Sequence, residues 1–259
     1  MNFAKIKKAV SAVTAAVLCV TMAFGTAASA ATDPVWKETK ALANAKYNST
    51  YIKLAEKYSK KESSKTVTFE KSKTKKFLDK QIKAIKSDDP QFSVYAINKD
   101  EIASVAYKDD KIKMVIYSKN VDLSIGIYED PKNVVMASPA DKEKITLPVS
   151  DAAAYEEVIN GMLDGFMNFN DENYYDNLGI KDTAKGKYFK IKSGDKTYYY
   201  EEFKSSQYDK FGFLFNEKGK PIAMVGDETI ACFSISYSVK DSAFKVPKDY
   251  KEVDLSELQ

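Results

Sequence analysis

The sequence predicts an α+β fold built on an antiparallel sheet, and three observations carry this expectation. Apolar residues recur at helical spacing over 35–60 and again over 150–169. Between and after these segments, apolar and polar residues alternate singly, over 92–147 and over 187–240. Short polar turns divide both alternating segments into strand-length runs, which is typical of antiparallel meanders. A chain of 259 residues can also bury a core without disulfide support.

The N-terminus has the pattern of a secretory signal peptide over residues 1–30. A lysine-containing start precedes an apolar stretch from Ala9 to Phe24, and Ala28-Ser29-Ala30 supplies small residues before a cleavage point. We expect cleavage after Ala30 and a secreted, extracytoplasmic protein whose single domain spans 31–259. An uncleaved membrane anchor is the alternative, although the apolar stretch is short for a bilayer span.

Composition excludes several classes of function. Every basic residue is a lysine, and the chain contains no histidine. Ser-His-Asp and Cys-His catalysis and imidazole metal ligands are therefore excluded, as is bidentate recognition of phosphate or guanine by arginine. The three lysines of the signal segment account for the formal net charge of +3, so the remaining chain is formally neutral. We expect no nucleic-acid partner, because binding to nucleic acid needs a basic surplus.

The first expected helix covers 35–60. An apolar stripe supports it, formed by Tyr47, Tyr51, Leu54 and Tyr58. A short strand is expected where Val67 and Phe69 alternate with polar residues. A second, shorter helix is expected over 74–86, and Asp88-Asp89-Pro90 ends it.

The first meander is expected over 92–147. Its strands cover, in order, residues 92–97, 101–107, 111–118, 121–128, 133–138 and 144–147. Two neighbouring strands each have one aliphatic face, made of Ile112, Met114, Ile116, Leu123, Ile125 and Ile127. Because the opposite positions are more polar, one face of this sheet is expected to be buried.

A strong helix is expected next, over 150–169, capped by Ser150 or Asp151. Its apolar stripe consists of Tyr155, Ile159, Met162, Phe166 and Phe169. Gly161 and Gly165 leave one face of this helix thin, so that another group could pack closely against it.

The second meander is expected over 187–240. Its strands cover residues 187–192, 196–203, 208–215, 221–225 and 229–239, and Ser193-Gly194-Asp195 forms a hairpin turn. In the last strand one face is apolar, with Phe233, Ile235, Tyr237 and Val239 opposite the face of Cys232.

No motif identifies a catalytic or metal site. Ser72-x-x-Lys75 and Ser193-x-x-Lys196 have the serine–lysine spacing of penicillin-recognising acyl enzymes, but lysine is frequent and the companion motifs are missing. The acidic segment 168–172 lacks the glycine and the glutamate of a calcium loop. We therefore expect no catalytic residue, no metal and no cofactor.

The remaining polar and aromatic features have ordinary structural explanations. The acid pairs Asp88-Asp89, Asp109-Asp110 and Glu201-Glu202 are expected to be solvated, at turns or on strand surfaces. Cys232, the single cysteine after cleavage, is expected to be a buried thiol. The run Tyr198-Tyr199-Tyr200 is expected to be a strand with aromatic residues on both faces.

Two segments resemble the LolA/LppX-like family of lipoprotein carriers and lipid-binding envelope proteins. Asn133 to Pro148 resembles that family's strand–turn–strand ending in proline, and Phe244-Lys-Val-Pro247 to Val253 resembles its closing segment. The resemblance implies an incomplete antiparallel barrel covered by helices, with an apolar cavity that takes acyl chains. Family carriers use an arginine to tie the covering helix to the barrel, and this chain has none.

The leading hypothesis is a secreted, non-enzymatic protein that binds a lipid or other hydrophobic ligand between sheet and helices. Its expected ligand contacts are Ile112, Met114, Ile116, Leu123, Ile125, Ile127, Tyr155, Ile159, Met162 and Phe166. Two alternatives remain open. One is an envelope protein-interaction or sensing module with a filled core, and the other is an enzyme that uses carboxylates, lysines and tyrosines.

Overall fold

The structure is a computed structural model that describes residues 47–85, 87–99, 102–109, 111–117, 122–127, 132–138, 142–148, 178–206, 208–227, 229–246 and 248–253. The expected signal peptide, the start of the expected helix at 35–60, the whole expected helix at 150–169 and the acidic segment 168–172 lie outside the described residues. So do the candidate ligand contacts Tyr155, Ile159, Met162 and Phe166.

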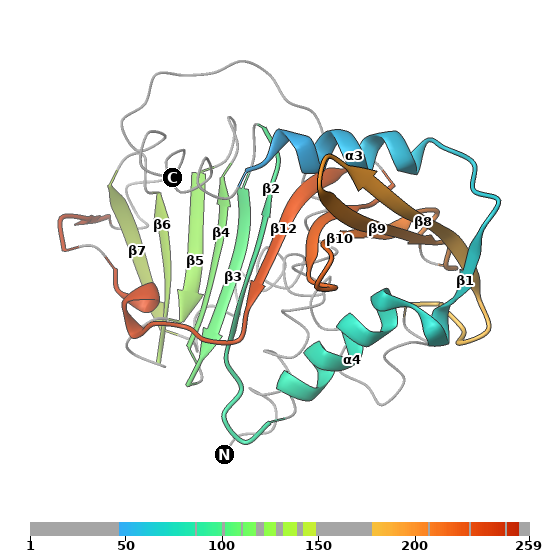
Figure 1. Cartoon of the computed structure of the whole chain (residues 1–259). Coiled ribbons are helices and arrows are strands. Elements are labelled where there is room, and N and C mark those ends of the chain that lie inside the picture. The colour runs from blue at the N-terminus through green and yellow to red at the C-terminus, as the bar shows by residue number, and fades with distance from the viewer. Residues whose placement is uncertain are drawn as a thin grey trace.

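A single 13-stranded sheet organises the chain, in the order β1-β8-β9-β10-β11-β12-β2-β3-β4-β5-β6-β7-β13 (Figure 1). The first meander contributes β2 (Phe92–Ile97), β3 (Ile102–Lys108), β4 (Lys111–Tyr117), β5 (Asp122–Ile127), β6 (Asn133–Ser138) and β7 (Glu143–Pro148). The second contributes β8 (Lys185–Ser193), β9 (Lys196–Phe203), β10 (Phe211–Phe215), β11 (Pro221–Val225) and β12 (Ile230–Ser236). The expected antiparallel meanders are thus confirmed, with boundaries shifted by a few residues at most strands.

The two meanders join edge to edge. β12, the last strand of the second meander, pairs antiparallel with β2, the first strand of the first meander. Ile235 is the register partner of Val94, and Phe233 is the partner of Ala96. One continuous sheet results, because each meander covers the open edge of the other.

Two short strands form the outer edges of this sheet. β1 (Thr66–Thr68) pairs antiparallel with β8, where a short strand was expected. β13 (Lys251–Glu252) pairs parallel with β7 and was not expected from the sequence. The order ends at β1 and β13 among the described strands, so the sheet is not closed into a barrel, and the α+β class with a largely antiparallel, incomplete sheet is confirmed.

Within the described residues, two helices cover the sheet from opposite faces, α3 (Ser49–Ser59) above and α4 (Lys73–Ile85) below in Figure 1. Leu214 of β10 packs with Ala55 of α3, whereas its neighbour Phe213 packs with Phe77 of α4. Successive residues of a strand point to opposite faces, so this pair of contacts assigns one helix to each face. The expected covering of the sheet by helices is therefore found within the described residues, with each helix on its own face.

Aromatic rings fill the interface between α4 and the sheet. The Phe77 ring lies 5.2 Å from the Phe213 ring and 5.7 Å from the Phe233 ring, both edge to face. Phe69, in the 3₁₀ turn η1 (Phe69–Lys71) that precedes α4, packs edge to face on Phe203 at 5.2 Å. Such contacts add to the hydrophobic burial, so this interface is the larger core of the described chain.

The helix boundaries follow from capping groups. Asn48 is extended and its Oδ1 atom accepts a hydrogen bond from the Thr50 amide at 3.0 Å, so the helix that was expected from residue 35 begins at Ser49. The helix expected over 74–86 is found at 73–85 as α4. In the last strand, pairing stops at Ser236, and Val239 joins a separate cluster with Phe244 of η3 (Asp241–Phe244) instead of the face of Phe233.

Within the described residues, neither helix combines the length and the apolar character that crossing a membrane requires.

Candidate functional site

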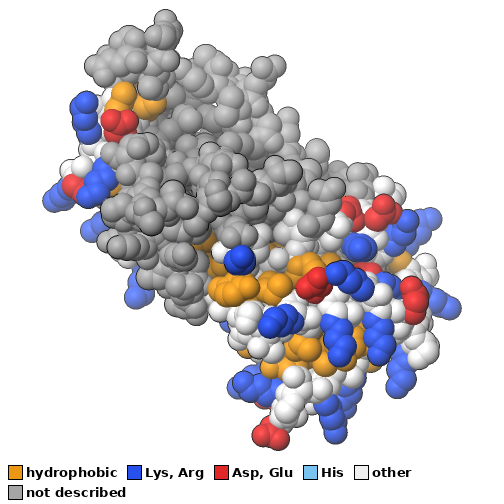
Figure 2. All heavy atoms as spheres, turned by 90° about the horizontal axis from the view of Figure 1, so that it is seen from above, with side chains coloured by type: hydrophobic (Ala, Val, Ile, Leu, Met, Phe, Trp, Pro, Cys, Tyr) orange, Lys and Arg blue, Asp and Glu red, His pale blue; other side chains and the backbone are white. Residues whose placement is uncertain are grey.

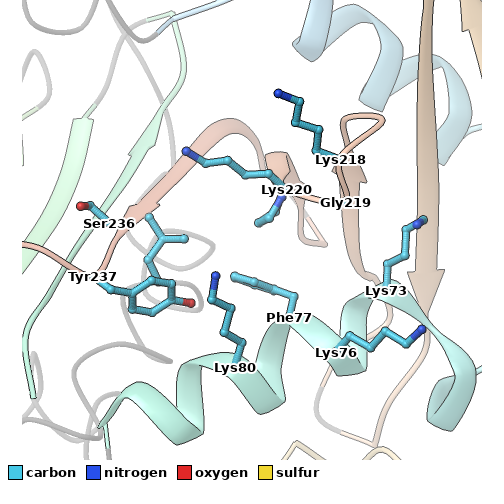
Figure 3. Close-up of a pocket in the computed structure, with 11 residues that line it drawn as sticks. Lys73, Lys76, Phe77, Lys80, Lys218, Gly219, Lys220, Ser236 and Tyr237 are labelled. Carbon is cyan, nitrogen blue, oxygen red and sulfur yellow. The ribbon is translucent and has the colours of Figure 1, made fainter. Parts of the chain in front are cut away.

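A pocket of about 580 Å³ lies between α4 and the turn that joins β10 to β11 (Figure 3). Five lysines line it, together with apolar and small residues. Its lining residues are Lys73, Lys76, Phe77, Lys80, Lys218, Gly219, Lys220, Pro221, Ile235, Ser236 and Tyr237. We call it the lysine pocket. No carboxylate is among these lining residues.

The first wall of the lysine pocket is one side of α4. Lys73, Lys76 and Lys80 are spaced three and four residues apart, so the helix places them along the same side. Phe77 belongs both to this wall and to the aromatic core beneath it. The helix is therefore anchored to the sheet by the same turn that presents its lysines.

The start of α4 is stabilised by a buried carboxylate from the sheet. Glu201 of β9 is 1% exposed, and its carboxylate accepts hydrogen bonds from the backbone amides of Lys73 at 3.0 Å and Thr74 at 2.8 Å. The Thr74 hydroxyl donates a third bond at 2.9 Å. A negative charge at a helix N-terminus is favourable, so Glu201 fixes the position of the first wall.

The second wall is the β10–β11 turn, which is held by its own side chain. Asn216 Oδ1 accepts hydrogen bonds from the amides of Lys218 at 3.1 Å and Lys220 at 3.0 Å. Gly219 has a φ of 74°, a left-handed conformation that favours glycine. The positions of Lys218 and Lys220 therefore depend on a specific turn rather than on a loose loop.

The floor between the two walls is apolar. Phe77 rises from α4 into the middle of the view in Figure 3, and Ile235 and Tyr237 come from the end of β12. The Tyr237 hydroxyl is buried and has no hydrogen-bond partner within the described part of the chain. Burial raises the pKa of Tyr237 to about 12, so this hydroxyl stays protonated at neutral pH. It is a donor without an acceptor in the floor of the pocket.

The positive charge of the lysine pocket is poorly compensated within the described part of the chain. None of its five lysines forms a salt bridge there, whereas Lys75, on another side of α4, pairs with Asp79 at 3.1 Å. Lys73 and Lys80 instead lie over the rings of Tyr199 and Tyr237, at 4.3 and 5.1 Å. Such cation–π contacts contribute only about 0.5–1 kcal/mol at exposed sites and leave the lysine charges in place. Because no acid lines the pocket, a bound anion would reduce the mutual repulsion of the lysines.

Lysines are common on the rest of the surface as well. Seen from above in Figure 2, lysine side chains are spread over the described part of that face, with apolar side chains between them. Exposed lysine alone therefore identifies no site. What distinguishes the lysine pocket is the combination of a concave shape, an apolar floor and a lining without acids.

The candidate ligand contacts of the first meander occupy paired positions in β4 and β5. Ile112 is the register partner of Ile127, Met114 of Ile125, and Ile116 of Leu123. The expected pairing of the two aliphatic strands is thus borne out at the level of the backbone. The lysine pocket, by contrast, was not expected from the sequence.

One series of register partners links these strands to the lysine pocket. Met114 is the partner of Val105, Val105 of Val94, and Val94 of Ile235, which lines the pocket. Directly paired residues share one face of a sheet. The aliphatic positions and the pocket floor therefore belong to the same face.

The serine–lysine motifs have structural roles. Ser72 caps α4: its hydroxyl donates to the Phe69 carbonyl at 2.6 Å and accepts from the Lys75 amide at 2.9 Å. Ser193 and Lys196 are register partners at the β8–β9 hairpin. The Ser72 hydroxyl is thus engaged with backbone groups and the Lys75 amine with Asp79, so this pair is not arranged for acyl transfer.

The Glu201-Glu202 pair corrects an expectation, since both side chains are buried rather than solvated. Glu201 caps α4, as described above. Glu202 accepts a hydrogen bond from the Tyr200 hydroxyl and pairs with Lys187 at 3.0 Å. Burial, and then the nearby Glu202 charge, raise the pKa of Tyr200. Within the described residues, no group of three or more acidic or cysteine side chains is arranged to hold a metal ion.

Cys232 and the tyrosine run have the environments that the sequence predicted. Cys232 is 4% exposed, its sulfur accepts from the Asn48 amide at 3.2 Å, and burial raises the pKa of the thiol. Tyr198 and Tyr200 pack on the α3 face, while Tyr199 packs against the α4 core. The tyrosine run is thus a strand with aromatic residues on both faces.

Comparison with known proteins adds little to this geometry. No family model matches the chain, and no curated protein matches it. A crystal structure of an uncharacterized conserved protein from Thermus thermophilus is similar over 70% of this chain and 99% of that chain, at 9% sequence identity and a TM-score of 0.35.

Proposed function

We propose that the chain is an exported, non-enzymatic protein that binds a ligand with an anionic group and an apolar body in the lysine pocket. Export rests on the signal-peptide pattern of residues 1–30. The observation that carries the binding proposal is the lining of the pocket, with five lysines and no acid around an apolar floor.

The two kinds of lining residue suit the two parts of such a ligand. Its anionic group neutralises lysines that have no salt-bridge partner in the described chain. Its apolar part covers Phe77, Ile235 and Tyr237, which removes apolar surface from water. The volume of about 580 Å³ falls within the usual range of small-molecule sites.

The aliphatic positions of β4 and β5 offer a path for a longer apolar chain. They lie on the same face of the sheet as Ile235, through the register partners Val94 and Val105. A lipid bound by its head group in the lysine pocket would extend its acyl chain along this face by displacing the groups that cover Val94 and Val105, which are 1% and 3% exposed. The proposal therefore keeps the hydrophobic ligand expected from the sequence and adds an anionic head group.

Displacement of a fluorescent fatty acid from the purified protein tests the proposal. The variant K73Q/K76Q/K80Q removes the α4 wall, and the matched control K190Q/K192Q/K196Q removes three exposed lysines from the β8–β9 hairpin. We expect about tenfold or greater weakening in the first variant and less than about twofold in the control, because charged contacts contribute more than a kcal/mol each in such sites. Equal affinities in both variants would contradict the proposal.

A second candidate function is an envelope protein-interaction or sensing module with a filled core and no ligand. The aromatic packing of Phe77, Phe213 and Phe233 between α4 and the sheet favours it, since no enclosed space remains among those rings. Native mass spectrometry of the purified protein separates the two functions. A co-purifying lipid supports the binding protein, and a ligand-free protein that ignores anionic amphiphiles supports the interaction module.

A further inference from the structure

The lysines of the pocket belong to two separate walls. Lys73, Lys76 and Lys80 come from α4, while Lys218 and Lys220 come from the β10–β11 turn. In Figure 3, Lys80 extends from the helix toward the side on which Lys220 and Lys218 lie. Each wall has its own support, Glu201 for the helix and Asn216 for the turn. A ligand seated between them is approached by cations from two sides.

We propose that the anionic group of the ligand is a phosphate carrying two negative charges, a phosphomonoester or pyrophosphate, held between these two walls. This inference rests on the proposed function and specifies the head group of the ligand. Because a phosphate presents several charged oxygens, it can contact lysines of both walls at once. A single carboxylate satisfies one wall and leaves the repulsion at the other.

The residue types of the pocket agree with a phosphate. The chain has no histidine and its cations here are all lysines, which bind phosphate as point charges from variable directions. In a site where the surrounding positive charge exceeds one, a second negative charge on the ligand adds a Coulomb gain of similar size to the first. The lining contains no carboxylate that would repel it.

Tyr237 supplies an independent observation. Its hydroxyl is buried without a hydrogen-bond partner among the described residues, and in Figure 3 it points toward Lys80, whose ammonium lies 5.1 Å from the ring centre. A phosphate bound by Lys80 therefore lies near this hydroxyl. The oxygen then donates to a phosphate oxygen and gains the partner that it otherwise lacks.

Isothermal titration with octyl compounds tests the charge of the head group. Octyl phosphate carries two charges at about pH 8 and mostly one at about pH 5.5, while octyl sulfonate carries one at both values. Since the chain has no histidine and the pocket lining has no carboxylate, the charge that changes over this interval is that of the octyl phosphate. We expect octyl phosphate to bind about tenfold more tightly than octyl sulfonate at about pH 8, and most of that advantage to disappear at about pH 5.5.

The two walls are tested by separate variants. We expect K218Q/K220Q and K73Q/K76Q/K80Q each to remove most of the preference for octyl phosphate over octyl sulfonate, while K190Q/K192Q/K196Q retains it. We expect Tyr237→Phe to weaken octyl phosphate severalfold, and Tyr199→Phe, which keeps the ring under Lys73, to leave it unchanged.

The outcomes separate this inference from the proposed function. Equal affinity for octyl phosphate and octyl sulfonate at about pH 8 overturns the two-charge phosphate but leaves an anionic amphiphile in place. Absence of binding by every anionic octyl compound overturns both. Inorganic pyrophosphate that binds as tightly as octyl phosphate supports the phosphate, identifies a free phosphate rather than a lipid head group as its source, and overturns the apolar part of the proposed function.

Discussion

α3 and α4 cover the same sheet from opposite faces, but they contact it differently. α3 is attached by tyrosine rings: Tyr51 lies 6.1 Å from Tyr198, and Tyr58 lies 4.9 Å from Phe189. Lys187 also donates to the carbonyl of Ser59 in its last turn at 3.1 Å. α4 is attached by the Phe77 side of the helix, and the lysines beside that side border a pocket. α3 therefore only packs on its face of the sheet, whereas α4 both packs on the sheet through Phe77 and lines the lysine pocket.

The largest difference in the free energy of unfolding is expected when one aromatic ring is removed from each helix. Phe77→Ala should lower the free energy of unfolding by about 3–5 kcal/mol, because it leaves a cavity among packed aromatic rings. Tyr58→Ala on α3 should cost clearly less, since its side chain is only partly buried. Urea denaturation of both variants measures the difference. Equal costs would show that the two helices are anchored alike.

The next largest effect concerns the start of α4. Glu201→Gln should cost about 2–3 kcal/mol, because an amide replaces a carboxylate that accepts three hydrogen bonds from the helix N-terminus. Hydrogen exchange should quicken in the first turn of α4 and stay unchanged in α3, whose cap is Asn48. A change of similar size in both helices would show a global loss of stability instead of a lost cap.

A pH effect of up to about 3 kcal/mol is expected from Tyr237 on the α4 face. Its pKa is raised by burial to about 12 in the folded protein, against 10.0 for an ordinary tyrosine. The unfolded chain therefore loses this proton first, and stability is present below pH 10 and lost as the pH rises from 10 to 12. Thermal unfolding at several pH values should show Tyr237→Phe gaining on the natural chain only above pH 10. A difference that is constant with pH would contradict the raised pKa.

The smallest effect concerns the lysines themselves. K76Q/K218Q/K220Q should raise the free energy of unfolding by a few tenths of a kcal/mol at low salt, because it relieves repulsion among cations without salt-bridge partners in the described chain and keeps the ring contacts of Lys73 and Lys80. High salt should abolish this gain by screening. The control K190Q/K192Q/K196Q should show no such salt dependence.

Local patterns were sufficient to predict most of the secondary structure. Alternation of apolar and polar residues located β2 to β12, and the spacing of Leu78, Ile82 and Ile85 located α4. The start of α3 was not predicted, because the apolar stripe includes Tyr47, whereas the helix begins only after Asn48. The Asn48 side chain caps the backbone there, and this local hydrogen bond sets the boundary. The pairing of β12 with β2 had no local signal, since strand order depends on edges that meet only in the folded chain.

The site depends on contacts between distant residues. Glu201 resembled a solvated acid because its partners at the start of α4 lie 127 residues away from it in the sequence. The lysine spacing on α4 was visible in the sequence, but nothing near it indicated that the β10–β11 turn would lie opposite. The missing companion motifs already argued against catalysis by Ser72-x-x-Lys75, and the contacts at the start of α4 supply its structural role.

The pairing of β12 with β2 has a consequence for how the chain is made. β2 is synthesised well before its partner, so the first meander has an unsatisfied backbone edge until almost the whole polypeptide has emerged. An exposed edge of this kind invites association with other nascent chains. A polypeptide that stays unfolded until β12 has been synthesised would bring both edges together at once, which makes late folding an advantage for this topology.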